Sequence, residues 1–144
     1  MKSSREKPTE QGNSPARRRT VVLDSFAWIE YFNGSSAGEK VQNFLETRLV
    51  VTPAIVVAEL SEKHKKLNRE FGPKYDFVKA RTSVVPLEEE LARVAGEINF
   101  ERKRSVKGWG MADSIVLATA RRSGSRIVTG DPHFRDLTEE TIML

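Results

Sequence analysis

Short apolar runs alternate with longer amphipathic segments from residue 20 to the end of the chain. An unbroken apolar run of a few residues is typical of a parallel strand buried on both faces, whereas apolar residues recurring every three or four positions indicate a helix. The runs predict strands at Thr20–Asp24, Leu49–Val51, Ser83–Leu87, Arg126–Asp131 and Thr141–Leu144. The third run contains Pro86, which cannot donate to a sheet ladder, so this strand is expected at an edge.

The segments between these runs predict helices. They are expected over Ser25–Asn33, Ala37–Glu46, Pro53–Leu67, Phe71–Arg81, Glu88–Arg104 and Ile115–Arg122, with one short helical turn at Pro132–Phe134. Thr52 is expected to be an N-cap and Pro53 the first helical residue, which favours a helix over a strand for the residues that follow. Strands separated by helices predict an α/β fold, a three-layer α/β/α sandwich around a parallel sheet of about five strands.

Residues 1–19 differ in composition from the rest of the chain. They hold six basic and two acidic side chains and almost nothing apolar, so we expect a disordered basic tail. Residues 20–144 are then a single domain. Its charged residues are 18 basic and 18 acidic, so the formal net charge of +4 belongs to the tail and does not indicate a basic nucleic-acid-binding domain.

Several classes of protein are excluded by what the sequence lacks. It has no cysteine, which excludes disulfides, thiolate metal sites and cysteine nucleophiles, and its two histidines cannot form a zinc centre by themselves. No apolar run approaches the roughly 18 residues that a membrane span needs. We therefore expect a soluble, cytoplasmic protein that does not interact with membranes.

Four acidic residues are candidates for a functional site. Asp24, Asp113 and Asp131 each directly precede an expected helix, and N-capping would explain any one of them taken singly. Glu59 is not a cap, and it lies on an apolar helical face where an unpaired charge needs a cationic side chain, a metal ion or a proton. Because the carboxyl ends of parallel strands share one edge of a sheet, the four acids are expected to meet there.

Such a cluster predicts a site for Mg²⁺ or Mn²⁺, since these ions prefer oxygen ligands. A bound divalent cation can activate water and offset charge on a phosphoryl group, so phosphodiester hydrolysis is the expected chemistry. Ser25, Ser114 and Thr129 stand beside three of the acids. Their hydroxyls could hold ligands or the attacking water, or they could be ordinary capping residues.

Three aromatic residues, Trp28, Tyr31 and Phe32, share one side of the expected helix Ser25–Asn33. Packing in the core is the favoured interpretation of this pattern. The alternative is that they line a groove for a partner protein.

Five segments of this sequence carry a family resemblance. They are Val21–Ser25, Trp28–Phe32, Thr52–Pro53 with Ala58–Leu60, Ala112–Ile115 and Val128–Phe134. In order and spacing they resemble the PIN-domain ribonucleases, and most of all the VapC toxins of bacterial and archaeal toxin–antitoxin pairs. The likeness runs from about residue 20 to the C-terminus, and Thr129–Phe134 is its most specific part.

The resemblance implies an endoribonuclease that depends on Mg²⁺ or Mn²⁺ and cuts an RNA substrate. It places the four acids around the ion and Thr129 in a supporting role. It also implies a homodimer that is neutralised by a small antitoxin, whose C-terminal segment occupies a groove and the site. Residues 1–19 fall outside the family's pattern.

Two other functions compete with this interpretation. A phosphoacceptor receiver domain also carries acids at strand ends, but it needs an adjacent acidic pair near the first strand, and Val22-Leu23-Asp24 lacks one. A catalytically silent PIN-like RNA-binding module would keep the fold and lose acids. All four acids are present in this sequence.

Overall fold

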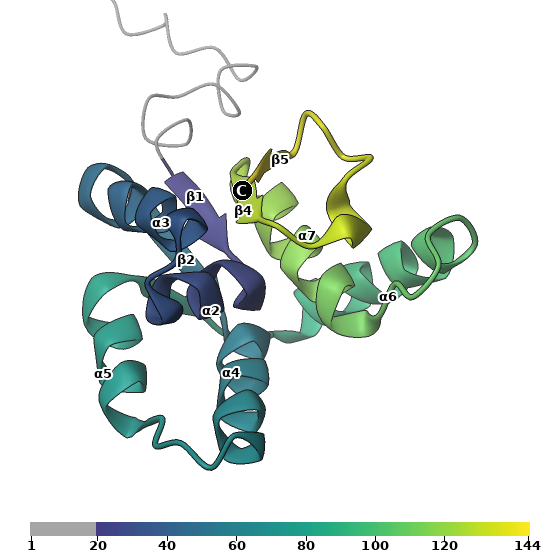
Figure 1. The fold of residues 1–144 in the computed structure, drawn as a ribbon. Helices are drawn as coiled ribbons and strands as arrows, with labels where there is room; N and C mark the ends of the chain where they lie inside the picture. Colours follow the sequence, from purple (N-terminus) through teal and green to yellow (C-terminus); the bar gives the residue numbers. More distant parts are fainter. Residues whose placement is uncertain (1–19) are drawn as a thin grey trace, which may run out of the picture.

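The computed structural model describes residues 20–144; the expected basic tail, residues 1–19, lies outside the described residues. Strands and helices alternate along the described chain (Figure 1). The elements are β1 (Thr20–Leu23), α2 (Ser25–Asn33), α3 (Ser36–Thr47), β2 (Leu49–Pro53), α4 (Ala54–Lys66), α5 (Gly72–Arg81), β3 (Ser83–Val85), α6 (Glu89–Lys103), α7 (Met111–Ser123), β4 (Arg126–Thr129), η3 (Pro132–Phe134) and β5 (Thr141–Met143). The expected strands and helices are all present.

The strands form one sheet in the order β3-β2-β1-β4-β5, and every neighbouring pair is parallel. From β1 the chain moves outward to β2 and β3, and it then crosses to the other side of β1 to form β4 and β5. Crossovers in opposite directions place helices on opposite faces of a parallel sheet, because both crossovers are right-handed. The α/β/α sandwich with a five-stranded parallel sheet is confirmed (Figure 1). The strand order places β3 at an edge, as expected.

The change of direction between β1 and β4 has two consequences. It leaves the carboxyl ends of β1 and β4 side by side at a topological switch point, which is where open α/β sheets bind ligands. It also differs from the strand order 2-1-3-4-5 of receiver domains. The receiver interpretation is therefore wrong for this chain.

The core is built around the central strands and α7. Val22, Leu23, Ile127 and Val128 are all completely buried, which explains why β1 and β4 carry unbroken apolar runs. Helix α7 is buried along residues 114–120, more than an amphipathic helix requires, because it packs on β1, β2 and β4 and is also covered by α6. None of the described helices is long and apolar enough to cross a membrane.

The expectation for Pro53 was wrong. Pro53 is the last residue of β2, in register with Val85, and it is the N-cap of α4, which begins at Ala54. A proline lacks only the N–H donor, so it is tolerated where a strand ends. Thr52 is a strand residue rather than a cap, and its buried hydroxyl accepts a 3.2 Å hydrogen bond from the Trp28 indole.

Helices α2 and α3 pack closely because α3 carries a glycine at the contact. An added Cβ at Gly38 would lie 2.1 Å from the carbonyl oxygen of Glu30 in α2. No side chain fits at that distance. Gly38 therefore fixes the separation of the two helices, and with it the position of the helix that follows Asp24.

We expect Gly38→Ala to lower the free energy of unfolding by about 1–3 kcal/mol, because the two helices must move apart to admit the methyl group. Gly96→Ala is the matched control. Gly96 lies inside α6 with no atom near its added Cβ, so alanine there should stabilise by about 0.5–1 kcal/mol. Urea unfolding measures both, and equal effects of the two substitutions would contradict this account of the α2–α3 contact.

Candidate active site

Two of the predicted acids lie at the switch point. Asp24 follows β1 and caps α2, where its Oδ1 accepts a 2.9 Å hydrogen bond from the backbone N–H of Ala27. Asp131 follows β4 after one glycine and caps η3, where its Oδ1 accepts a 2.9 Å hydrogen bond from the backbone N–H of His133. Both aspartates are therefore caps, as expected, and the pairing of β1 with β4 brings them to the same edge of the sheet.

Asp113 reaches the site by a different route from the one expected. Helix α7 begins at Met111, with Gly110 as its N-cap, so Asp113 is the third residue of the helix rather than the residue before it. Its Oδ2 accepts a 3.2 Å hydrogen bond from the backbone N–H of Gly110. An acid in the first turn of a helix can close back on the N-cap in this way, which extends the helix start beyond the apolar pattern.

Glu59 lies half-buried on α4, near the end of the helix that adjoins β2. Burial raises the pKa of its carboxyl, and the negative charges of Asp113, Asp131 and Glu62 raise it further, while a hydrogen bond from the Ser25 side chain opposes the shift. Glu59 thus shares an electrostatic environment with Asp113 on α7 and with Asp131 after β4. Ser25, one of the three hydroxyl residues that stand beside an acid in the sequence, thus binds a different acid, Glu59.

Thr129 connects two of the acids. Its side chain is completely buried at the end of β4. Its hydroxyl accepts a 3.0 Å hydrogen bond from the backbone N–H of Asp131 and makes a hydrogen bond to the Asp24 carboxylate that lowers the pKa of that group. One hydroxyl therefore fixes the relative positions of the residues that follow β1 and β4.

A histidine that was not among the predicted site residues lies in the cluster. The Nδ1 atom of His133 lies 3.0 Å from Oδ2 of Asp113 and 3.6 Å from Oδ1 of Asp131. Ligand atoms of these three residues lie within 4.8 Å of one another, which makes them the tightest group of potential metal ligands among residues 20–144. His133 stands two residues after Asp131 in the most specific segment of the sequence, and that proximity was the available signal.

The backbone around His133 is shaped to hold the imidazole. Gly108 has a φ of +84°, and an added Cβ there would lie 2.9 Å from Nε2 of His133. The ring is thus confined between the Gly108 backbone and the Asp113 carboxylate. An ionised carboxylate only accepts hydrogen bonds, so an ionised Asp113 would take this hydrogen bond from a protonated Nδ1.

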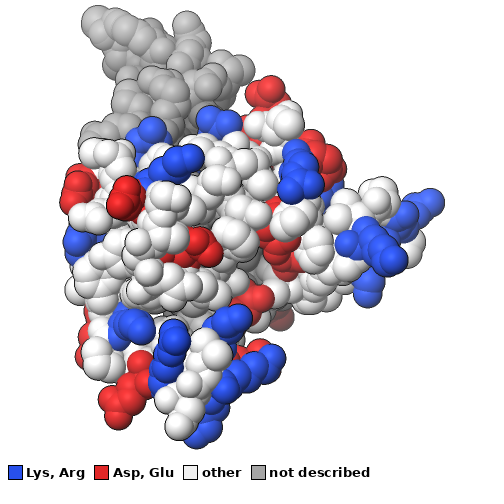
Figure 2. All heavy atoms as spheres, in the orientation of Figure 1, with Lys and Arg blue, Asp and Glu red and all other residues white. Residues whose placement is uncertain are grey.

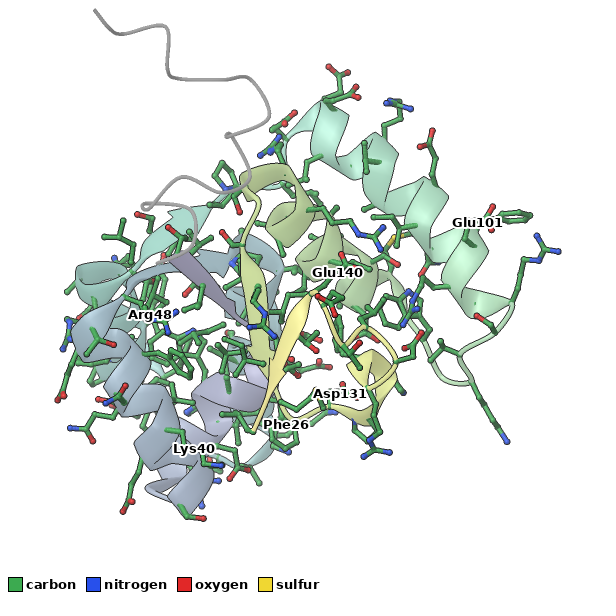
Figure 3. All side chains as sticks on the ribbon, turned by 90° about the horizontal axis from the view of Figure 1, so that it is seen from above. Phe26, Lys40, Arg48, Glu101, Asp131 and Glu140 are labelled. Carbon is green, nitrogen blue, oxygen red and sulfur yellow. The ribbon has the colours of Figure 1, made fainter. Side chains whose placement is uncertain are left out.

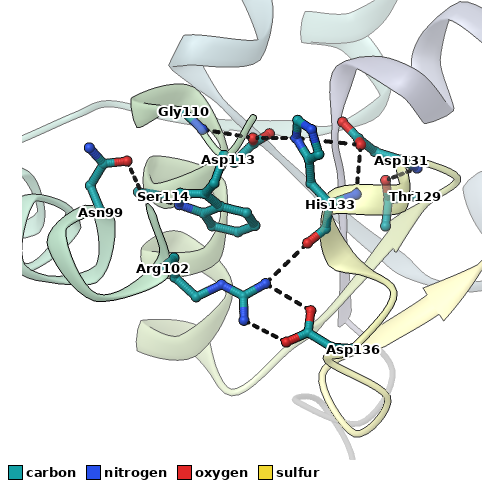
Figure 4. A network of polar contacts seen from close by, with 10 residues as sticks. Asn99, Arg102, Gly110, Asp113, Ser114, Thr129, Asp131, His133 and Asp136 are labelled. Carbon is teal, nitrogen blue, oxygen red and sulfur yellow. Dashed lines mark hydrogen bonds and ion pairs between the residues drawn. The ribbon is translucent and has the colours of Figure 1, made fainter. Parts of the chain in front are cut away.

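A polar network behind the site joins α6 to the segment after β4 (Figure 4). The Arg102 guanidinium lies 4.3 Å from the ring centroid of Trp109, donates to the carbonyl of His133 at 3.0 Å, and binds both carboxylate oxygens of Asp136. A planar guanidinium that makes a bidentate ion pair has little freedom to move. The segment that carries Asp131 and His133 is therefore held against α6.

Ser114 belongs to this network and not to the site. It is completely buried, and its hydroxyl accepts a 2.7 Å hydrogen bond from the Trp109 indole and donates a 2.9 Å hydrogen bond to Asn99. Both partners lie on the side of α6 and the loop after it. The expectation that Ser114 might hold a ligand or a water was wrong, because its hydroxyl is already used to anchor the start of α7.

Core packing accounts completely for one of the three aromatic residues that share one side of α2 and in part for the other two. Trp28 is completely buried and stacks on Phe32 with ring centroids 5.4 Å apart, so core packing accounts for it. Tyr31 and Phe32 are only partly buried. Phe32 also lines a surface pocket between α2, α4 and α5 with His64 and Lys74.

The acids carry charge that the described residues do not neutralise. Asp24 is 5% exposed, and burial raises its pKa from 3.8 to about 7, with further increases from Asp131 and Glu59. No lysine or arginine among residues 20–144 forms an ion pair with Asp24, Glu59, Asp113 or Asp131. Buried carboxylates without a cationic partner are typical of a site that binds a metal ion.

The raised pKa of Asp24 predicts a stability that depends on pH. The folded protein keeps this proton up to about pH 7, whereas the unfolded chain releases it near pH 4, so stability falls as the pH rises between these values. Asp24→Asn keeps the cap and lacks the charge. Without added metal, its advantage over the wild type should grow by on the order of 1–3 kcal/mol from about pH 5 to about pH 8.

Thermal unfolding at several pH values measures this difference. Asp76→Asn is the matched control, because Asp76 is an exposed aspartate on α5. A difference between Asp24→Asn and the wild type that stays constant with pH would show that Asp24 ionises normally in the folded protein.

Comparisons with known proteins agree with this geometry. The model of the PIN domain family matches residues 21–140. Similar solved structures include VapBC2 from Rickettsia felis bound to promoter DNA, with 17% identity, a TM-score of 0.68 and coverage of 87% of this chain and 97% of that one. A toxin–antitoxin complex from Klebsiella pneumoniae has 17% identity, a TM-score of 0.69 and coverage of 85% and 96%.

VapC20 from Mycobacterium tuberculosis, a toxin that cleaves the sarcin–ricin loop, has 14% identity, a TM-score of 0.65 and coverage of 81% and 94%. No curated protein matches the chain in sequence. At these identities the structural likeness shows a common fold, and the family model extends over most of the chain. The chain belongs to the PIN domain family.

Proposed function

We propose that this protein is a metal-dependent endoribonuclease and the toxin of a VapBC-type toxin–antitoxin pair. The nuclease domain comprises residues 20–144, and residues 1–19 are a basic tail. The observation that carries the proposal is the group of acids at the switch point, where the pKa values of Asp24 and Glu59 are raised by burial and by neighbouring acids, and where no lysine or arginine among residues 20–144 forms an ion pair with the acids. We place its activity in the cytoplasm, where a VapC toxin would meet RNA.

The proposed ligands of Mg²⁺ or Mn²⁺ are Asp24, Glu59, Asp113 and Asp131, with Thr129 in support. The chemistry of these donors fits a hard cation, because all four are carboxylates and the side chains of Asp113 and Asp131 are partly exposed. When bound, such an ion activates water and stabilises charge on the phosphoryl group.

The chain's own residues would position this chemistry. Thr129 holds Asp24 and Asp131 at a fixed separation, and Ser25 orients Glu59. His133 donates from Nδ1 to Asp113 and so keeps one carboxylate oxygen fixed while the other stays available. An imidazole that orients a ligating carboxylate in this way acts as an outer-shell partner of the metal.

The charge distribution of this face supports a polyanionic substrate. Figure 2 shows acidic side chains in the middle of the face, with lysine and arginine side chains on the outer ends of α4 and α6. These basic residues are Lys63, Lys65 and Lys66 on α4, and Lys103, Arg104 and Lys107 at the end of α6 and in the loop after it. None of the six forms an ion pair within the described residues, so they are available to bind phosphates.

Two protein partners are part of the proposal. Several similar structures are complexes of toxins with antitoxins, which supports a small cognate antitoxin for this chain. The pocket lined by Phe32, His64 and Lys74 is a candidate contact for it. A homodimer is proposed on the family resemblance.

The alternative function is a catalytically silent PIN-like RNA-binding module. Such a module would not need buried carboxylates whose burial raises their pKa, since an uncompensated charge destabilises the fold. The retention of all four acids favours the nuclease.

Metal binding gives the first test of this proposal. Mn²⁺ or Mg²⁺ should raise the melting temperature of the wild type by mass action, whereas Asp24→Asn and Asp113→Asn should show little or no shift. The amide removes the negative charge that binds a hard cation. Calorimetry with Asp76→Asn as the control measures the effect, and equal metal binding by all variants would refute the ligand assignment.

Cleavage gives the second test. Asp24→Asn, Glu59→Gln, Asp113→Asn and Asp131→Asn should each fold and each lose most of the Mg²⁺-dependent cleavage of RNA, by at least roughly tenfold. Capping alone would leave Asp131→Asn nearly unaffected, because asparagine caps about as well as aspartate. Gel analysis of labelled RNA measures the rate, and full cleavage by these variants or in excess EDTA would rule out the mechanism.

A further inference from the structure

Packing in the hydrophobic core does not explain the position of Phe26. It is the second residue of α2, two residues after Asp24, and it is 36% exposed. Its ring lies outside the hydrophobic core and stacks on no other aromatic ring in the described part of the chain. By contrast, Trp28 on the same helix is completely buried.

The ring of Phe26 lies against the backbone of the site. An added Cβ at Gly130 would lie 2.3 Å from Cε1 and 2.7 Å from Cζ of Phe26, so the ring covers the one residue between Thr129 and Asp131. Figure 3 shows Phe26 and Asp131 at the same end of the molecule. The phenyl ring is therefore an apolar surface beside the acids, at the edge of the sheet where β1 and β4 end.

An exposed aromatic ring beside a site that cleaves phosphodiester bonds can bind a base of the substrate. A nucleobase next to the reacting phosphate needs a flat apolar partner when it leaves its own stack, and aromatic side chains supply this in proteins that bind single-stranded nucleic acid. Phe100 near the end of α6 is also an exposed phenyl ring, but the Arg104 guanidinium lies over it and it is not in contact with the backbone of the site. Phe26 is an exposed phenyl ring that directly contacts the backbone between two site residues.

We propose that Phe26 stacks on a nucleobase adjacent to the scissile phosphate. This inference rests on the proposed ribonuclease function. It adds a residue that binds the substrate without binding metal. It also predicts tolerance of base identity at the stacked position, because every base has a π face.

The first experiment compares Phe26→Ala, Phe26→Leu and Phe26→Tyr. The probe is a fluorescein-labelled, random-sequence, single-stranded RNA of about ten nucleotides, which matches typical single-strand site sizes. Fluorescence anisotropy is measured in the Asp113→Asn background so that the RNA stays intact. We expect alanine to raise Kd by about 5- to 150-fold and tyrosine to bind like the wild type.

Phe26→Leu separates stacking from simple filling of space. Leucine covers Gly130 with apolar atoms and lacks a π face, so its Kd should resemble that of the alanine variant. In the otherwise wild-type protein, the same variants should raise KM far more than they lower kcat, with melting temperatures unchanged. Leu49→Ala is the control, because Leu49 is 56% exposed at the opposite edge of the sheet, where β2 begins.

The second experiment locates the stacked base. A sequence that the wild type cuts is chosen from the random pool, its cut position is mapped, and an abasic nucleotide is placed on either side of the cut in turn. In the Asp113→Asn background, one of these RNAs should bind more weakly than the intact RNA, and adding Phe26→Ala should then cause no further loss. Such non-additivity identifies two groups that contact each other.

The outcomes distinguish the stacking role of Phe26 from the proposed ribonuclease function. If the wild type cuts RNA while Phe26→Ala or Phe26→Leu binds as tightly as the wild type, or if the abasic and alanine effects simply add, the stacking role is overturned and the nuclease stands. If the wild type neither binds nor cuts RNA, both are overturned.

Discussion

The parallel pairing of β1 with β4 is the constraint on which the site depends. Its register sets Leu23 opposite Val128, so the residues that follow the two strands leave the sheet side by side. Asp24 then meets the hydroxyl of Thr129, which also accepts from the N–H of Asp131. A shift of one residue would exchange the two buried faces of a strand and separate Asp24 from Thr129, so the same packing that stabilises the sheet also fixes the acids.

The grouping of acids at this edge lowers the stability of the metal-free protein. Burial raises the pKa of Asp24 and Glu59, and the negative charges of neighbouring acids raise both further, so the metal-free protein carries an electrostatic strain at neutral pH. Hydrogen bonds from Thr129, Ala27 and Ser25 offset part of it. A divalent cation would offset much of the remainder, which explains why the fold tolerates a group of acids that an ordinary core would not.

Hydrogen bonds on one side hold the elements that carry the acids, and on the other side an aromatic ring remains exposed. Trp109, Ser114 and Asn99 anchor the start of α7, and Arg102 holds the segment after β4 against α6. These contacts keep Asp113 and His133 in place without occupying the site. On the other side, Phe26 presents an exposed ring beside the same edge.

The sequence by itself determined the class of fold, because buried strands and amphipathic helices leave periodic patterns, and it singled out the four acids, because Asp24 and Asp131 come at strand ends, Asp113 lies near the start of an expected helix and Glu59 lies on an apolar helical face. It did not determine where α7 begins, since the bond from Gly110 to Asp113 leaves no apolar pattern. It placed Pro53 wrongly, because local propensity cannot show that a strand may end on a proline. Tertiary structure alone decided that β4 lies beside β1, that His133 joins the acids, that Ser114 turns away from them, and that Phe26 covers Gly130, because each of these depends on contacts between residues distant in sequence or on the folding of the turn that carries them.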